Sequence, residues 1–217
     1  MTFPNSPRLL KAGLVLVDPQ SGQVRQVIAL QYNPDTLSRS FQSQSVGEAT
    51  DRSEALRLKG PAIETYKLDA EIDATDQLEF PAQHRATVEH GIQPQLAALE
   101  LLLYPSSSQL TANNARAAAG TLEIVPMETP LTLFVWSRTR IVPVRVTDFS
   151  VTEDAFDPAL NPLRARVSLG LRVLSVDDLG FSHKGGSIFM GYLQAKERLA
   201  SLSAPGTLSA FGIGGIS

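Results

Sequence analysis

Three histidines are the first residues that could carry chemistry, because imidazole acts as a general base and as a metal ligand near neutral pH. They are His84, His90 and His183, and none belongs to an HExxH pair or to another metal-binding spacing. His84 and His90 stand six residues apart and would not share one face of a helix. We therefore interpret all three as surface or partly buried side chains and predict no metal site.

A first group of acidic residues offers oxygen ligands of the kind that calcium prefers. The group is Asp69, Glu71, Asp73 and Asp76, but no glycine turn or terminal bidentate glutamate completes a loop of the EF-hand kind. The first three of these residues alternate with apolar ones, as on a strand with one buried face. We interpret them as the solvated outer face of that strand.

A second acidic group could form an acid and base pair for catalysis. Glu153, Asp154 and Asp157 stand beside Pro158 in a predicted turn, with no apolar pocket evident to raise a carboxyl pKa. The chain contains no GxSxG elbow, no P-loop and no GxGxxG motif, and residues 184–187 (KGGS) lack the order of a phosphate-binding loop. We predict a protein that is not an enzyme, with no catalytic residue and no cofactor.

Composition excludes several further classes. The 217 residues include 19 basic and 22 acidic side chains, a net charge of -3 that gives no electrostatic case for nucleic acid or an anionic membrane. There is no cysteine, so disulfides and thiolate metal sites are excluded. No cationic leader and no window of about 18 uncharged apolar residues appears. We expect a protein that is made in the cytoplasm and does not insert into a membrane.

The elements that must position the side chains are mostly strands. Residues 131–136 and 141–152 alternate between apolar and polar side chains and are joined by a polar turn, which predicts a hairpin. A third alternating run, 164–173, would place Ala165, Val167, Leu169, Leu171 and Val173 on one buried face. The three strands should form an antiparallel meander.

The other helices, strands and loops are predicted from the same kinds of sequence pattern. Their predicted types come from apolar period, turn residues and helix-terminating prolines. The predictions are a hairpin at 14–17 and 24–32, strands at 63–73 and 121–125, helices at 93–104 and 188–202, and a surface loop at 106–120 with a short helical piece near 115–119. The fold class is therefore mainly β with one packed helix and a helical, glycine-rich C-terminal extension.

Two polar segments carry isolated apolar residues that suit contacts between subunits. Residues 36–60 are long for a connection within a domain, and they are either a flexible surface loop or an arm that folds against a neighbouring subunit. The glycine-rich tail, 204–217, is either disordered or held by a partner. The candidate subunit-interface residues are Phe41, Val46, Leu56, Leu58, Phe211 and Ile213. Trp136, the only tryptophan, is interpreted as core or interface packing.

Several short motifs occur together along residues 10–180. They are Gly60-Pro61 before Glu64-Thr65, residues 71–76 (EIDATD), 102–105 (LLYP), 130–136, 143–146 (PVRV), 156–158 (FDP), 161–162 (NP) and 170–173 (GLRV). This combination resembles the tube and baseplate-hub proteins of contractile injection systems, which are phage-tail-like particles of bacteria. Singly, none of these motifs is specific.

The resemblance implies a tube-type fold, in which antiparallel sheets close into a sandwich-like barrel with one helix alongside. Six copies would form a ring by joining sheets edge to edge, with the arm at 36–60 reaching the neighbour or the next ring. It also implies a domain at 1–180 and a docking extension at 181–217. The partners would be the inner-tube protein above and the spike, hub and baseplate wedge proteins below.

Within this family the extra C-terminal segment favours the adaptor that joins the inner tube to the central spike. The expected location is the bacterial cytoplasm during assembly and then the injection particle. Relatives in this role often carry a peptidoglycan-binding LysM module, which this sequence lacks. The alternatives are the repeating inner-tube subunit, a peptidoglycan- or carbohydrate-binding β-domain and, after these, an unrecognised hydrolase.

Overall fold

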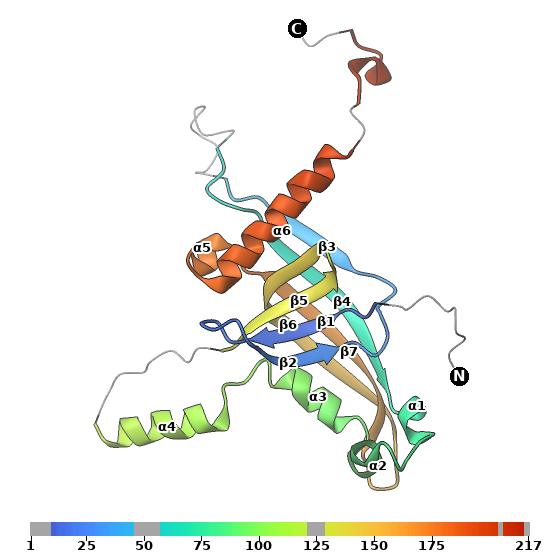
Figure 1. Cartoon of the computed structure of the whole chain (residues 1–217). Coiled ribbons are helices and arrows are strands. Elements are labelled where there is room, and N and C mark those ends of the chain that lie inside the picture. The colour runs from blue at the N-terminus through green and yellow to red at the C-terminus, as the bar shows by residue number, and fades with distance from the viewer. Residues whose placement is uncertain (1–9, 46–56, 121–128, 204–205, 215–217) are drawn as a thin grey trace.

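The protein is built on one antiparallel sheet, seen in a computed structural model that describes residues 10–45, 57–120, 129–203 and 206–214 (Figure 1). Its seven strands are β1 (Gly13–Val17), β2 (Val24–Ala29), β3 (Ser38–Gln42), β4 (Ile63–Asp73), β5 (Leu131–Ser137), β6 (Arg140–Phe156) and β7 (Pro162–Val173). They lie in the order β2-β1-β5-β6-β7-β4-β3. The mainly β class is confirmed, and the strands belong to a single sheet rather than to two.

The alternating pattern of β4 and β7 determines which face of the sheet is buried. All five predicted side chains of β7, from Ala165 to Val173, are buried, as are Tyr66, Leu68, Ala70 and Ile72 of β4. β7 pairs with β4 on one side and with β6 on the other. The predicted meander β5-β6-β7 is confirmed, because the period of two fixes one register for each strand.

The first hairpin is part of the same sheet. β1 pairs with β2 as predicted, and its other edge pairs with β5, more than a hundred residues further along the chain. The turn between β1 and β2 is closed by the carboxylate of Asp18, which accepts backbone N–H groups of Gln20 and Ser21. The opening ribbon therefore extends the meander instead of standing apart from it.

β6 is longer than predicted and is irregular near its middle. It runs for 17 residues, and its register against β7 shifts between Val146 and Asp148. Glu153 and Asp154 therefore lie on the strand and not in the turn, while Asp157 forms the turn by accepting backbone N–H groups of Ala159 and Asn161. A bulge of this kind bends a strand, which suits a sheet that curves.

The helices occupy the ends and one face of the curved sheet. They are α1 (Thr75–Leu78), α2 (Arg85–His90), α3 (Gln93–Glu100), α4 (Ser107–Ala118), α5 (Val176–Leu179), α6 (Lys184–Ser201) and the short 3₁₀ helix η1 (Leu208–Phe211). The two predicted helices correspond to α3 and α6. Ile92, at the N-cap of α3, and Leu96 and Leu99 within it enter the core, as do Phe189 and Tyr192 of α6.

The prediction of a surface loop at 106–120 was wrong. Residues 107–118 form α4, because Ser106 and Gln109 make reciprocal side-chain to backbone hydrogen bonds that begin a helix. None of the residues of α4 is buried, and the helix projects from the body in Figure 1. The strand predicted at 121–125 lies outside the described residues.

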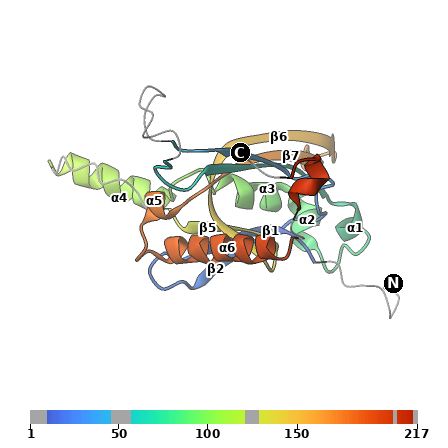
Figure 2. The same cartoon turned by 90° about the horizontal axis from the view of Figure 1, so that it is seen from above.

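The two ends of the sheet curve toward each other. Beyond β2, the side-chain amide of Gln31 donates to the carbonyl oxygen of Asp73 (2.8 Å) and accepts from its N–H (2.9 Å), at the end of β4. Figure 2 shows α6 running along one side of the body, and Figure 1 shows it crossing the upper ends of the strands. The core is therefore enclosed by a curved sheet, α3 and α6.

We expect Gly13→Ala to destabilise the fold. A Cβ at Gly13 would stand 2.4 Å from the backbone oxygen of Ile28, so β1 and β2 must separate, at a cost of about 2 kcal/mol in the free energy of unfolding. Gly191→Ala is the matched control, because a Cβ there meets nothing within 4 Å and alanine favours a helix by about 0.5–1 kcal/mol. Urea denaturation of both variants measures the difference, and an unchanged Gly13→Ala protein would contradict the close β1–β2 contact.

Candidate assembly interface

Both edges of the sheet are open among the described residues. β2 ends the sheet on one side and β3 on the other, and each has a strand partner along one edge only. An open edge presents unpaired backbone N–H and C=O groups to any strand that approaches. Neither edge strand contains proline, and Val27 on β2 is 63% exposed. These edges are therefore suited to pairing with another chain.

Phe41, a predicted interface residue, lies on the edge strand β3. It is 54% exposed, and its ring is contacted by the guanidinium of Arg39 at 4.9 Å and by Nζ of Lys196 at 5.0 Å. A cation over an aromatic face is attracted by the ring quadrupole. Phe41 is thus an exposed aromatic side chain held in place by two cations, one from its own strand and one from α6.

The other predicted interface residues are spread over different parts of the chain. Leu58 is exposed and forms an isolated antiparallel bridge with Ser45, within the proposed arm. Val46 and Leu56 lie outside the described residues. Phe211 and Ile213 are exposed in and after η1, which lies beyond the end of α6 and away from the sheet (Figure 1). The structure does not bring Phe41 and the C-terminal segment into one patch.

A buried charged cluster joins β3, β4 and α6, and sequence reasoning missed it. The carboxylate of Glu64 on β4 is 3% exposed. It accepts hydrogen bonds from Arg39 (2.9 Å), from the Tyr192 hydroxyl (2.8 Å) and from Nζ of Lys196 (2.7 Å). Tyr66 adds a hydroxyl 2.9 Å from that of Tyr192. The signal was present, because Glu64 is in phase with the apolar face of β4.

The cluster keeps Glu64 ionised. Burial by itself would raise the pKa of Glu64, but the hydrogen bonds from Lys196 and Tyr192 outweigh it, so the pKa lies below its usual value. The same burial and the adjacent Tyr192 hydroxyl raise the pKa of Tyr66, which stays a neutral hydrogen-bond donor. Two cations therefore share one buried carboxylate, and the group fastens α6 to the edge of the sheet.

The residues first considered for catalysis or metal binding are spread apart or have structural roles. His84 and His183 are N-cap residues, and Nδ1 of His183 accepts the N–H of Gly185 at 3.0 Å. Asp73 pairs with Arg164 and Glu71 with Arg166 across the outer face of the sheet. In the described parts of the chain, no three His, Cys, Asp or Glu side chains gather as a metal site would need.

Two further findings concern Trp136 and membranes. Trp136 packs against the core, with its ring 6.0 Å from that of Phe134, as one of its two interpretations predicted. Over the described ranges, every helix is too short or too polar to cross a lipid bilayer.

Comparisons with known proteins place the chain near no characterised family. No family model matches it, and no curated protein does. One similar solved structure is described as the tail of an empty GTA particle with C6 symmetry, with 12% identity, a TM-score of 0.28, and coverage of 75% of this chain and 90% of that one. Another is the virion of a native gene transfer agent particle, at 11% identity and a TM-score of 0.26 over the same shares of the two chains. Likenesses this low assign no function.

We expect the Glu64 cluster to make stability depend on pH in the acidic range. Because the folded pKa of Glu64 is lowered, its contribution is fully present above the unfolded value near 4.5 and is lost as pH falls through the lower folded value. Glu64→Gln should remove this component and lower the free energy of unfolding at pH 7 by about 3 kcal/mol, since two partly buried cations lose their carboxylate. Denaturant unfolding between pH 3 and 7 measures both effects.

Glu71→Gln is the matched control for that experiment. Glu71 lies on the same strand and pairs with Arg166, but both side chains are more than half exposed. Exposed pairs contribute little, so stability at pH 7 should change by less than about 1 kcal/mol. A Glu64→Gln protein with the same pH profile as the wild type would contradict the role assigned to the cluster.

Proposed function

We propose that the chain is a non-enzymatic structural subunit that forms a ring in a phage-tail-like contractile injection particle. The observation that carries the proposal is the pair of open edges, β2 and β3, at the two ends of one curved sheet. A subunit with two unlike edges can join copies in a head-to-tail manner, and such contacts close into a ring when the rotation between copies allows it. The sequence resemblance supports a ring of six.

Within this class we propose the adaptor ring between the inner tube and the central spike. The support is the C-terminal part of the chain, where α5, α6 and η1 follow the last strand, and η1 extends away from the sheet (Figure 1). The resemblance to plain tube subunits extends only to about Leu179, so α6 and η1 are additional to it. The inner tube above and the spike, hub and wedge proteins below are the proposed partners, and the particle is the proposed location.

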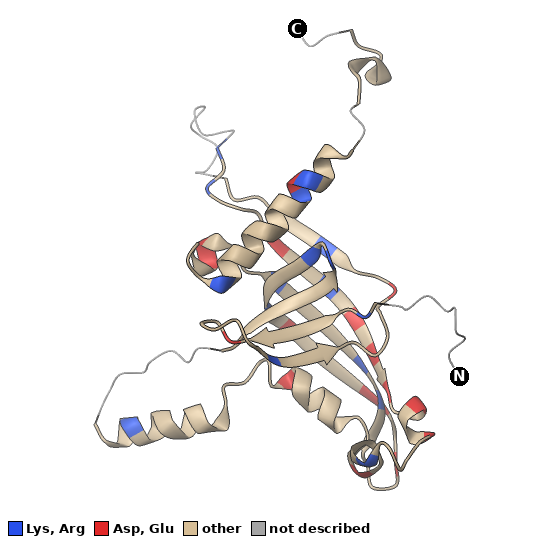
Figure 3. Cartoon of the chain, viewed as in Figure 1, with Lys and Arg blue, Asp and Glu red and all other residues tan. Residues whose placement is uncertain are grey.

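Charge does not distinguish the two ends of the molecule. Figure 3 shows residues of both signs on α6 and along the lower part of the sheet. On α6, Glu197 stands between Lys196 and Arg198, and Lys196 is paired with the buried Glu64. Glu71 and Asp73 of β4 are paired with arginines of β7. The proposal therefore depends on the strand edges and not on charge.

Mass and shape measured together test the proposal. Light scattering with negative-stain imaging over a concentration series should show rings with six times the mass of one chain. Growth that stops at one ring supports the adaptor, whereas long cylinders would favour the repeating tube subunit. A monomer at every concentration, also in the presence of tube and spike proteins, would overturn the ring proposal and favour a small carbohydrate-binding domain.

We expect Phe41→Glu to weaken ring formation without unfolding the protein. The introduced carboxylate would face Arg39 and Lys196, so the fold tolerates it, but it would place a charge at the β3 edge. The association constant should fall by about tenfold or more, as for loss of an aromatic interface anchor. Phe80→Glu is the matched control, because Phe80 is also 54% exposed but lies between α1 and α2 and not on β3. Equal ring formation by both variants would exclude the β3 edge.

A further inference from the structure

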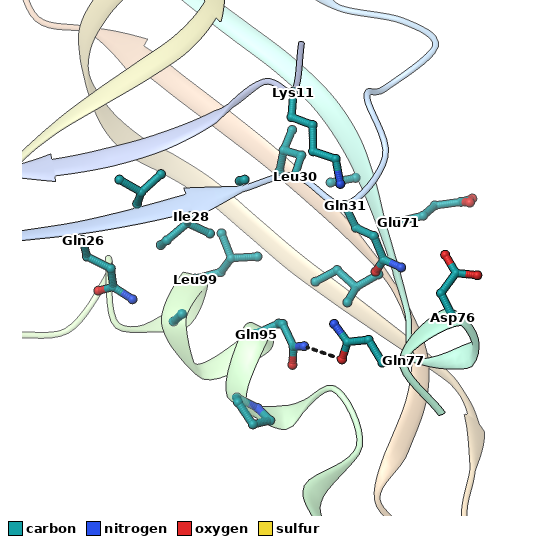
Figure 4. Close-up of a pocket in the computed structure, with 16 residues that line it drawn as sticks. Lys11, Gln26, Ile28, Leu30, Gln31, Glu71, Asp76, Gln77, Gln95 and Leu99 are labelled. Atoms are coloured by element: carbon teal, nitrogen blue, oxygen red, sulfur yellow. Dashed lines mark hydrogen bonds between the residues drawn. The ribbon is translucent and has the colours of Figure 1, made fainter. Parts of the chain in front are cut away.

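A hollow of about 530 Å³ lies beside the edge strand β2 (Figure 4). We call it the edge slot. Its walls include Val27 and Ala29 of β2, Glu71 and Ile72 of β4, and Gln95 and Leu99 of α3. The volume is within the range of about 300–1,000 Å³ that is usual for ligand pockets. The edge slot is therefore large enough for several residues of an extended peptide.

Two strand edges border the edge slot, and both are unpaired there among the described residues. β3 pairs with β4 only as far as Lys67, so the part of β4 at 68–73 has β7 as its one strand neighbour. Ladder bonds alternate along an antiparallel strand. The N–H of Leu30 donates to the carbonyl oxygen of Ala12, the residue just before β1. By alternation, the backbone groups of Val27 and Ala29 point the other way, away from β1 and toward the open side.

At one end of the edge slot, a side chain already makes the hydrogen bonds that an added strand would make. The N–H and C=O of Asp73 face away from β7, and the side-chain amide of Gln31 satisfies both of them. Gln31 therefore takes the place of a strand at that position and closes the end of the slot. Glu71, two residues back on β4, directs its backbone groups to the same side, with no such substitute in the described chain.

The floor of the edge slot is apolar and contains one unsatisfied polar atom. Ile28, Leu30 and Leu99 contribute apolar surface, as Figure 4 shows. Gln95 donates from Nε2 to Gln77 at 3.5 Å, but its buried Oε1 has no hydrogen-bond donor. Buried polar atoms are normally paired. An occupant should therefore bring apolar side chains and at least one N–H group.

Among the described residues, the segment 206–214 has these properties. Leu208, Phe211 and Ile213 are exposed, and residues 199–217 include no charged side chain. The segment lies beyond the end of α6, at the opposite end of the molecule from α1 and the edge slot (Figure 1). Other segments match less well, since residues 1–9 contain Pro4 and Pro7, which cannot donate to a ladder, and residues 46–56 carry four charges.

We propose that residues 207–213 of one copy add as a strand to β2 of a second copy, in the edge slot. The side chains of Phe211 and Ile213 lie on one face of such a strand and cover the apolar floor. The four-residue η1 unwinds at little cost, because so short a helix has few internal hydrogen bonds. Each copy then gives one segment and receives one, which is a head-to-tail contact that can close a ring.

This inference rests on the proposed function in one respect, the association of copies. It replaces direct pairing between β2 of one copy and β3 of the next, because the added segment occupies the β2 edge. It also changes the role expected for the C-terminal segment, which the sequence assigned to the spike or wedge proteins. Here residues 207–213 join neighbouring copies, and the exposed Leu199 of α6 and Leu202 at its C-cap remain for other partners.

A labelled synthetic peptide of residues 203–217 tests the proposal on the full-length chain. The receiving protein is the double variant Phe211→Ala, Ile213→Ala, which keeps the edge slot but lacks the two side chains that would fill it. We expect saturable binding of the peptide by fluorescence anisotropy. We also expect an excess of peptide to reduce the mass of wild-type assemblies.

Val27→Pro, added to the double variant, provides the discriminating comparison. Proline removes an N–H that points to the slot and not to β1, so β1–β2 pairing is kept, and binding should fall by about tenfold or more. Val27→Thr is the matched control, which retains the N–H and should bind as before. Circular dichroism and thermal unfolding check that the variants are folded.

Two results would overturn the inference. One is a folded double variant that does not bind the peptide, and the other is equal binding by the Val27→Pro and Val27→Thr proteins. The proposed function is judged separately by the wild-type mass. Rings that persist in the double variant would contradict the edge-slot contact and leave the ring proposal standing. Peptide binding by a chain that never forms rings would support the edge-slot contact and contradict the ring proposal.

Discussion

The hydrogen bonds to the buried carboxylate of Glu64 are the interaction that joins α6 to the β3 edge of the sheet. Glu64 lies on β4 and takes hydrogen bonds from Arg39 on β3 and from Tyr192 and Lys196 on α6. A buried charge that loses its donors is costly, so the cluster stabilises the contact of β3 and α6 with β4. It acts together with Phe189 and Tyr192, which anchor α6 in the core. The aromatic ring of Phe41 is held at the edge by the same two cations.

The sequence predicted the elements whose information is local. Alternation in β4 and β7 gave both the strand and its buried face, because a period of two permits only one register with the apolar side chains inside. The helices α3 and α6 followed from the helical period. The helix α4 was missed because its residues are small and polar, and its start depends on the Ser106–Gln109 capping box rather than on an apolar stripe.

The features that depend on distant pairing could not be predicted. The contact of β1 with β5, the single sheet and the contact between Gln31 and Asp73, 42 residues apart, have no local signal. The same holds for the edge slot, whose walls come from four separate stretches of the chain. Phe41 was predicted as an interface residue because it is an isolated apolar residue in a polar segment, and the structure shows it exposed on β3. The buried cluster at Glu64 could have been predicted from the alternation of β4. Glu64 is in phase with the apolar face of that strand, and a buried carboxylate needs buried hydrogen-bond partners.

The curved sheet of this chain stops short of a closed barrel for a physical reason. The side chain of Gln31 occupies the end of the gap between β2 and β4, and α3 fills the space beneath it, so the two edges cannot pair with each other. Strand edges left in this state attract other strands, and closure is the one arrangement that removes them. A strand from another molecule is one way to cover such an edge, and charges, bulges or a covering helix are others. On the β2 side the described chain supplies a covering group only at Asp73, through Gln31, so the proposed association would cover what the fold leaves open.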